Sequence, residues 1–160
     1  MNTGELDPRA QAAWRHYLLA YNRITRAMES EMAERAGLTL SQYDVLLRLS
    51  ESTGGRMRMS DLAEAVVYST GGLTRLLGRM HDSGLVRRAP SDEDRRVIYA
   101  ELTGHGRARL LAASEVHLEG VTRHFAQHLR PEEAAPVAAF LGRLNGADHI
   151  GGHAWATETP

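Results

Sequence analysis

Residues 69–103 read STGGLTRLLGRMHDSGLVRRAPSDEDRRVIYAELT, and this stretch decides the fold. Apolar residues first recur at steps of three and four. This predicts an amphipathic helix that begins at the N-cap Ser69, ends at Gly84 and buries Leu73, Leu76, Leu77 and Met80. From residue 85 the apolar period falls to about two, so residues 85–89 and 95–102 are predicted strands joined by the turn-forming residues 90–94. The stretch therefore predicts a helix followed directly by a β-hairpin.

Two shorter helices are predicted upstream of this stretch. Ser41 is the expected N-cap of the first, which holds the apolar residues of 43–49, and Ser60 is the expected N-cap of the second, over residues 61–67. The alternating residues 56–59 (RMRM) indicate a short strand between them. Two helices, a tight junction at residues 67–69, a third helix and a hairpin follow one another in the order of a winged helix-turn-helix.

Long helices are predicted on both sides of this module. Asp7 and Pro8 begin the first, which ends at Gly37 and carries one apolar stripe: Trp14, Tyr17, Leu18, Tyr21, Ile24, Met28 and Met32. Thr103 begins the second, with Leu110, Leu111, Leu118, Val121, Phe125 and Leu129, and a last helix starts at residue 131. These stripes are longer than so small a domain can cover, which indicates a second copy as partner.

The predicted fold is therefore mainly α with a small β wing, a winged helix-turn-helix with long terminal dimerisation helices. Within a single structural domain, residues 1–37 form the predicted N-terminal dimerisation helix and residues 38–102 the predicted winged helix-turn-helix module. Residues 103–145 form the C-terminal dimerisation helices, and residues 146–160 are a tail without periodicity.

The composition excludes several classes of protein. The chain has 160 residues and no cysteine, which excludes disulfides, cysteine-bound metals and thiol sensing. Apolar runs fall short of the roughly 18–20 residues of a membrane span, and the first residues lack a signal-peptide core, so we expect a cytoplasmic protein without a membrane partner. The net charge is −1, yet residues 56–109 hold ten arginines against seven acidic residues. A basic middle between acidic ends favours a phosphate-binding module.

Arginine and threonine side chains make the third helix and the hairpin candidates for DNA binding. Arg75 and Arg79 are four residues apart, hence on one helix face, and arginine reads guanine in the major groove. At the hairpin tip, Asp94 can orient Arg96 by a charge-assisted hydrogen bond for entry into the minor groove. The alternative is an amphipathic core helix with a solvated arginine face and an ordinary charged turn.

The sequence resembles the MarR (multiple antibiotic resistance regulator) family of transcription factors. The resemblance rests on Asp94-Arg95-Arg96 followed by Leu102-Thr103, on STGGLTRL at 69–76, on GLVRR at 84–88 and on similar helix starts at 40–46 and 59–63. It implies that Ser69, Thr70, Thr74, Arg75 and Arg79 serve major-groove binding, and that Arg95 and Arg96 serve the wing, with Asp94 positioning Arg96. It also implies a homodimer on a pseudo-palindromic double-stranded DNA operator.

The family resemblance further implies a repressor released by a small aromatic or phenolic anion. Trp14, Tyr17, Tyr21 and Tyr43 are the candidates to line its crevice, and core and dimer packing is the competing interpretation. His124 and His128, placed with His117 on one predicted helix face, support the alternative of a metal- or pH-responsive regulator.

Two further classes compete with a DNA-binding regulator. A winged-helix protein-interaction module without DNA affinity is the first. An enzyme is the second, but the sequence has no glycine-rich phosphate loop, no HExxH and no visible Ser-His-acid arrangement. We therefore expect neither catalysis nor a cofactor.

Overall fold

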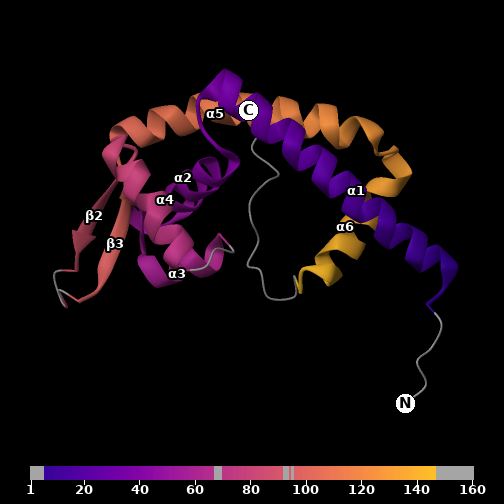
Figure 1. Ribbon diagram of the computed structural model, residues 1–160, viewed down its shortest axis with the longest axis horizontal. Helices are drawn as coiled ribbons and strands as arrows, with labels where there is room; N and C mark the ends of the chain where they lie inside the picture. The colour runs from indigo at the N-terminus through magenta and orange to yellow at the C-terminus, as the bar shows by residue number, and fades with distance from the viewer. Residues whose placement is uncertain (1–5, 67–69, 92–93, 95, 147–160) are drawn as a thin grey trace, which may run out of the picture.

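The computed structural model describes residues 6–66, 70–91, 94 and 96–146. It confirms a mainly helical fold with a small wing and long terminal helices (Figure 1). The elements are, in chain order, α1 (Pro8–Glu31), η1 (Met32–Ala36), α2 (Leu40–Glu51), η2 (Thr53–Gly55), β1 (Arg56–Arg58), α3 (Met59–Ala65), α4 (Thr70–Asp82), β2 (Val86–Pro90), β3 (Ile98–Leu102), α5 (Gly104–His124), η3 (Ala126–His128) and α6 (Pro131–Leu144).

The core lies inside the winged module, beneath α4. The four residues predicted to face inward from α4, Leu73, Leu76, Leu77 and Met80, are all buried. They pack with Leu46 and Leu49 of α2, Leu62 of α3 and Val86 of β2, and the N-terminal part of α5 adds Leu110 and Ala113. Because α4 buries one face so completely, its opposite face is left to solvent.

Helix ends follow the predictions in part. Gly37 ends the first helical segment with a φ of 62°, and Thr103 caps α5 by accepting from the amide of Gly106 at 2.9 Å, both as predicted. The predicted caps of α2 and α3 are wrong. Thr39, not Ser41, caps α2, in a capping box with Gln42, and Ser60 lies inside α3, which starts one residue earlier.

Three antiparallel strands form the wing, in the order β1-β3-β2. The register pairs Arg58 with Tyr99 and Arg56 with Glu101 on one side of β3, and Arg87 with Glu101 on the other. The second hairpin strand is shorter than predicted: it begins at Ile98. The preceding residues turn instead, because the amide of Val97 donates to the carbonyl oxygen of Asp94 at 2.9 Å.

The long helices form an arch beside the winged module. In Figure 1, α5 runs along the top, α1 descends to the lower right, and the winged module lies at the left. Helices α1 and α5 meet at Gly120, where an added Cβ would lie 3.5 Å from the side chain of Met28. Ion pairs join the same helices: Arg123 and His124 each lie 2.8 Å from Glu31.

The second long helix ends earlier than its apolar stripe predicted. Phe125 has a φ of −131° and a ψ of −65°, so α5 stops at His124, and a short 3₁₀ turn leads to α6. Of the predicted stripe, Leu110 is buried, whereas Leu111 and Leu118 are largely exposed in the single chain. The predicted helix through Leu129 is therefore wrong.

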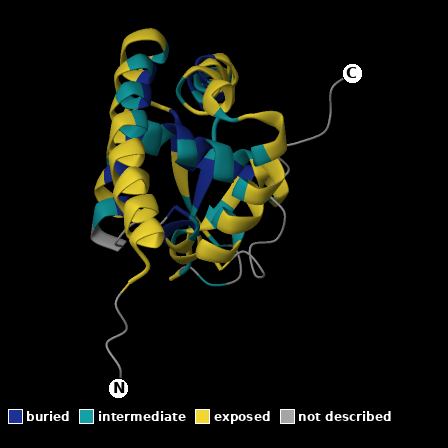
Figure 2. Ribbon diagram, turned by 90° about the vertical axis from the view of Figure 1, so that its right-hand side faces the viewer, coloured by how far each residue is buried: buried dark blue, intermediate teal, exposed yellow. Residues whose placement is uncertain are grey.

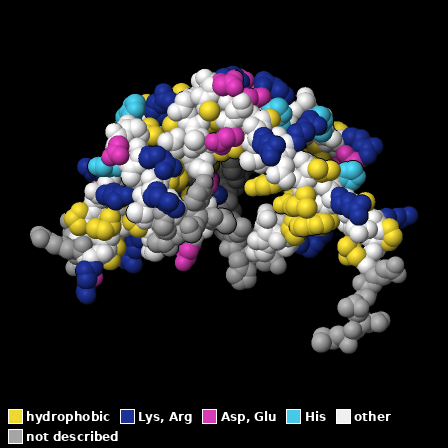
Figure 3. Space-filling model, viewed as in Figure 1, with side chains coloured by type: hydrophobic (Ala, Val, Ile, Leu, Met, Phe, Trp, Pro, Cys, Tyr) yellow, Lys and Arg dark blue, Asp and Glu magenta, His cyan; other side chains and the backbone are white. Residues whose placement is uncertain are grey.

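Large apolar side chains remain exposed along both terminal segments. Every residue from Leu6 to Arg23 is exposed, and Figure 2 shows this part of α1 in the exposed colour. Trp14 is 54% exposed and Phe140 of α6 is 51% exposed. Hydrophobic side chains gather on the right-hand limb of the arch, over α1 and α6 (Figure 3). Among the described helices, none has both the length and the apolar character needed to cross a bilayer.

Replacing Gly106 by alanine is expected to destabilise the fold by about 1–3 kcal/mol, because the added Cβ overlaps the backbone carbonyl oxygen of Leu85. Gly104, the first residue of the same helix, is the matched control, since a Cβ there meets nothing within 4 Å. Denaturant unfolding of both variants measures the difference. Equal midpoints for Gly106→Ala and Gly104→Ala would contradict the close approach.

Candidate nucleic-acid interface

Helix α4 presents its polar face away from the core. Thr74, Arg75 and Arg79 are exposed, whereas the intervening Leu76 and Leu77 are buried. The wing is tied to this helix, because Arg88 Nη2 donates to the backbone carbonyl oxygen of Thr74 at 3.0 Å. The helix and β2 thus hold a fixed relative position, which suits a surface that contacts two grooves at once.

The wing tip carries the orienting contact that the sequence predicted. Asp94 Oδ1 accepts from the backbone amide of Arg96 at 3.0 Å and from Arg96 Nε at 3.2 Å. The side chain of Arg96 is 92% exposed. Because so exposed an ion pair contributes little to stability, the effect of this contact is to restrict where the guanidinium points.

Some predicted DNA-binding positions fall outside the described residues. These are Ser69, which precedes α4, and Arg95, at the wing tip; the side chain of Thr70 is likewise not described. Their predicted roles stay predictions. The described part of the predicted interface therefore consists of Thr74, Arg75 and Arg79 on α4 and of Asp94 and Arg96 on the wing.

The structure also gathers charged side chains that the sequence reasoning missed. Glu101 of β3 is nearly buried between Arg56 of β1 and Arg87 of β2, and it pairs with both. The guanidinium of Arg56 lies 4.9 Å from the ring centroid of Tyr99. The alternation RMRM at residues 56–59 was the available signal, because it places Arg56 and Arg58 on the same face of a strand.

The four aromatic residues predicted to line an effector crevice separate into two groups. Trp14, Tyr17 and Tyr21 stack along the exposed part of α1, with ring centroids 5.8 and 6.3 Å apart. Tyr43 is instead 6% exposed, in the core of the winged module, and it stacks on His117 at 4.5 Å. Burial lowers the pKa of His117, which favours its neutral form.

The two histidines considered for metal binding have different surroundings. His124 Nε2 lies 2.8 Å from Glu31 Oε1, and this hydrogen bond, with Arg123 nearby, holds the pKa of the Glu31 carboxyl below its usual range. His128 lies in η3, after the helix has ended, so its predicted place on one helix face with His117 is wrong. In the part of the chain that the structure describes, no cluster of three or more metal-ligating side chains occurs.

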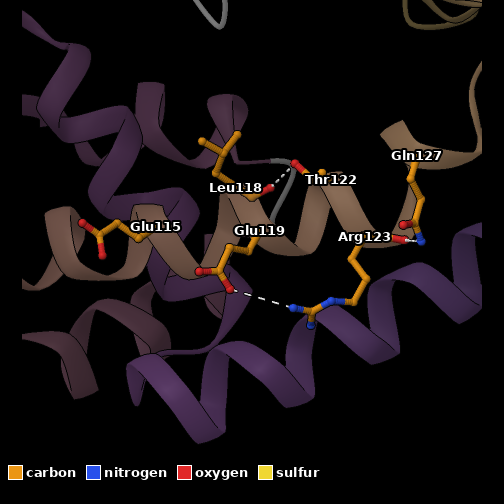
Figure 4. A pocket seen from close by; sticks show the side chains of 6 residues that line it. All are labelled: Glu115, Leu118, Glu119, Thr122, Arg123 and Gln127. Carbon is orange, nitrogen blue, oxygen red and sulfur yellow. Dashed lines mark hydrogen bonds and ion pairs between the residues drawn. The ribbon is translucent and has the colours of Figure 1, made fainter.

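Two hollows adjoin these residues at the far end of α5. One, of about 270 Å³, is lined by His124, His128, Arg23 and the apolar side chains of Ala20, Ile24, Phe125 and Leu129. The other is an open groove of about 640 Å³ along the C-terminal half of α5, shown in Figure 4. There Arg123 points toward Glu119, with Nη2 to Oε2 at 3.8 Å.

Comparisons with known proteins agree with this geometry. Residues 36–97 match the family described as the MarR family. The chain is 37% identical to AbsC, a MarR family transcriptional regulator from Streptomyces coelicolor, over 92% of this chain and 98% of AbsC, with a TM-score of 0.83. Sco3205 from the same organism, a MarR family regulator crystallised in complex with DNA, is 25% identical over 91% and 94% of the two chains, with a TM-score of 0.84.

A curated relative extends the match beyond the winged module. The HTH-type transcriptional regulator YfiV of Bacillus subtilis is 28% identical over 92% of this chain and 89% of its own length. Sequence and structure thus agree from the terminal helices to the wing. The chain belongs to the MarR family of DNA-binding transcriptional regulators.

Proposed function

We propose that this regulator is a homodimeric repressor that binds a pseudo-palindromic operator and leaves it when a small aromatic anion binds. The observation that carries the DNA contact is the oriented guanidinium of Arg96, held by Asp94 at the exposed wing tip. Its 92% exposure leaves the guanidinium accessible to a minor groove, where negative potential is concentrated. Arg75 and Arg79 on α4 supply the major-groove contacts of the same half-site.

The exposed terminal helices support a homodimer. Leu18 and Leu19 on α1 are 38% and 69% exposed, and Phe140 and Leu144 on α6 are about half exposed, although a chain of this size has enough core to bury such residues. A two-fold axis through these helices buries the same patch on both copies. It also presents two α4 helices and two wings to one duplex, which is why the operator is expected to be an inverted repeat.

The effector class rests on the aromatic residues of α1. Stacked, exposed rings at Trp14, Tyr17 and Tyr21 offer flat surfaces for an aromatic ligand. Arg23 lies two residues after Tyr21 in α1, and it could pair with the charge of an anion. Its side chain lines the hollow that His124 also lines. Tyr43 is buried in the winged module, where it stacks on His117, so it lies apart from the exposed rings of α1.

Two other functions remain as alternatives to a repressor released by an aromatic anion, and the experiments below distinguish them. A winged-helix module that binds protein rather than DNA is disfavoured by the arginines of the wing tip and by the DNA complex of Sco3205. Metal or proton sensing through His124 and His128 is favoured only by the contact of His124 with Glu31.

Selection of bound sequences from random duplexes is expected to return an inverted repeat with half-site centres about 34 Å apart, bound by two chains. The variant Arg75→Ala, passed through the same selection, is expected to lose preference at one position of each half-site, because its guanidinium no longer reads a base. Sequencing of the selected pools measures both effects. A pool without any enriched repeat would contradict the proposal.

Arg96→Ala is expected to weaken operator binding by about 1–3 kcal/mol, while dimerisation and thermal unfolding stay as in the wild type, because the side chain is almost fully exposed. Fluorescence anisotropy with a labelled operator measures the affinity. Arg26→Ala, which removes an equally charged exposed residue from the side of α1 opposite its aromatic residues, serves as the control. If both variants bind like the wild type, the wing tip does not contact DNA.

Salicylate and benzoate are expected to displace the operator at fixed protein concentration, whereas zinc ions leave it bound. Competition anisotropy with these three probes separates the effector classes. Release by zinc that disappears in the double variant His124→Ala/His128→Ala would replace the aromatic anion by a metal as the effector. Indifference to both anions at millimolar concentration would contradict the ligand part of the proposal.

A further inference from the structure

The hollow of about 270 Å³ lies where α5 ends and the chain turns toward α6, at the right-hand end of the arch in Figure 1. We call it the corner hollow. Ala20, Arg23 and Ile24 line it from one side of α1, since residues three and four apart share a helix face. The turn after α5 supplies the rest of the lining, which is His124, Phe125, His128 and Leu129. All seven residues belong to the terminal segments, so the corner hollow is separate from the winged module.

The shape of the corner hollow follows from how α1 and α5 cross. The two helices touch at Gly120, where an added Cβ would lie 3.5 Å from the side chain of Met28. One turn further along, α5 stops, because Phe125 has a φ of −131° and a ψ of −65°. The space beside Ile24 is therefore not filled by a continuing helix. Four of the seven lining side chains are apolar, namely Ala20, Ile24, Phe125 and Leu129.

The guanidinium of Arg23 lines this apolar space without a counter-ion. Within the described part of the chain, no carboxylate forms an ion pair with it. Arg123 of α5, by contrast, lies 2.8 Å from Glu31. The described residues that line the corner hollow include no acidic side chain. A cation beside an apolar wall is suited to an anion that carries an apolar body.

The carboxylate of Glu31 touches a lining residue, but its charge is already engaged. Glu31 Oε1 lies 2.8 Å from both His124 Nε2 and Arg123 Nη1. These contacts fix the ring of His124, and Arg123 balances the charge of Glu31. His128 lies in η3, outside this network of contacts, and an imidazole can donate a hydrogen bond in either protonation state. Arg23 and His128 are thus the two groups that remain to bind an anion.

We propose that the corner hollow binds a small carboxylate whose apolar body is one ring or a short branched chain. Arg23 and His128 bind the carboxylate, and Ile24, Phe125 and Leu129 contact the apolar body. The inference deepens the proposed function by placing the anion here and not against the stacked rings of α1. It rests on that function only for the claim that this anion also releases the operator.

Size and chemistry select this class of ligand. A volume of about 270 Å³ falls at the lower end of ligand pockets, so one ring fits and a long acyl chain does not. The planar fork of a guanidinium matches a carboxylate with two parallel hydrogen bonds. A side chain of a second copy is the competing occupant, and the experiment below separates it from a small anion.

Isoleucine methyl groups give a direct probe, because the chain has only three isoleucines, Ile24, Ile98 and Ile150. Ile24 lines the corner hollow, whereas Ile98 lies in β3 of the wing. The full-length protein, labelled with ¹³C at the isoleucine δ1 methyls, is titrated with benzoate in the absence of DNA. We expect a saturable shift of the Ile24 methyl, while Ile98 does not respond. Benzamide, which has the same ring without the charge, is expected to bind about fivefold more weakly or less.

Four variants locate the contacts. Arg23→Gln is expected to weaken benzoate binding by about fivefold to tenfold, and His128→Gln by about twofold to fivefold. Arg26→Gln removes an exposed charge one turn along α1, outside the lining, and should match the wild type within about twofold. Ala20→Leu fills the corner hollow and is expected to abolish the Ile24 shift. Thermal unfolding and sedimentation are recorded for every variant.

The same variants connect the corner hollow to the operator. In competition anisotropy, Arg23→Gln is expected to raise the benzoate concentration of half-release by the same factor by which it weakens binding. Its affinity for the operator without benzoate should equal that of the wild type, because α1 lies apart from the wing. Benzoate that binds as expected but leaves the operator bound would support the site and contradict the effector part of the proposed function.

Three results would overturn the inference. An Ile24 methyl that ignores benzoate, or that responds equally in Arg23→Gln, means that the corner hollow is not a carboxylate site, whatever the operator experiments show. Equal binding of benzoate and benzamide, or an equal effect of Arg26→Gln, removes the role of the Arg23 charge. A methyl shift that follows dilution of a dimer, and not benzoate, shows that a second copy fills the corner hollow.

Discussion

The architecture depends on the joint that Thr103 makes between the wing and the long helix α5. Its hydroxyl caps α5 at the amide of Gly106 and donates to the carbonyl oxygen of Gly84 at 2.7 Å, while its own amide donates to Leu85 at 3.2 Å. Gly106 lets the first turn of α5 lie directly against that backbone. A single residue therefore joins the segment that follows α4, the base of the wing and the start of α5.

The parts that local periodicity determines could be predicted from the sequence. The buried side of α4, the cap at Thr103 and the bond from Asp94 to Arg96 each depend on residues a few positions apart. The cap of α2 was misplaced because Thr39 and Ser41 are both good caps, and the capping box with Gln42 decides between them. The end of α5 was missed because neither glycine nor proline marks it; Phe125 changes direction there without a local signal.

The residues of the candidate interface likewise divide into those that local sequence predicts and those whose contacts depend on tertiary structure. Arg75, Arg79 and Arg96 follow from motif and helix face, whereas Arg58 meets Tyr99 across 41 positions of sequence, through a strand pairing that no short motif specifies. The separation of Tyr43 from the aromatic residues of α1 is equally a tertiary result, since it depends on α2 packing against α5 at His117. Such contacts can be predicted only when the register of the sheet and the packing of the helices are known.

The joint at Thr103 has a mechanical consequence for the proposed homodimer. Helix α5 has 21 residues, about 30 Å in length, and its first turn is locked to the wing. The helix therefore moves as a rigid rod. Its C-terminal end lies beside Glu31, His124 and the hollow that His124 lines. A rotation of about 5° at that end moves the wing by roughly 3 Å, comparable to the rise of one base pair. In the proposed homodimer, small rearrangements among the terminal helices thereby change the spacing between the two wings.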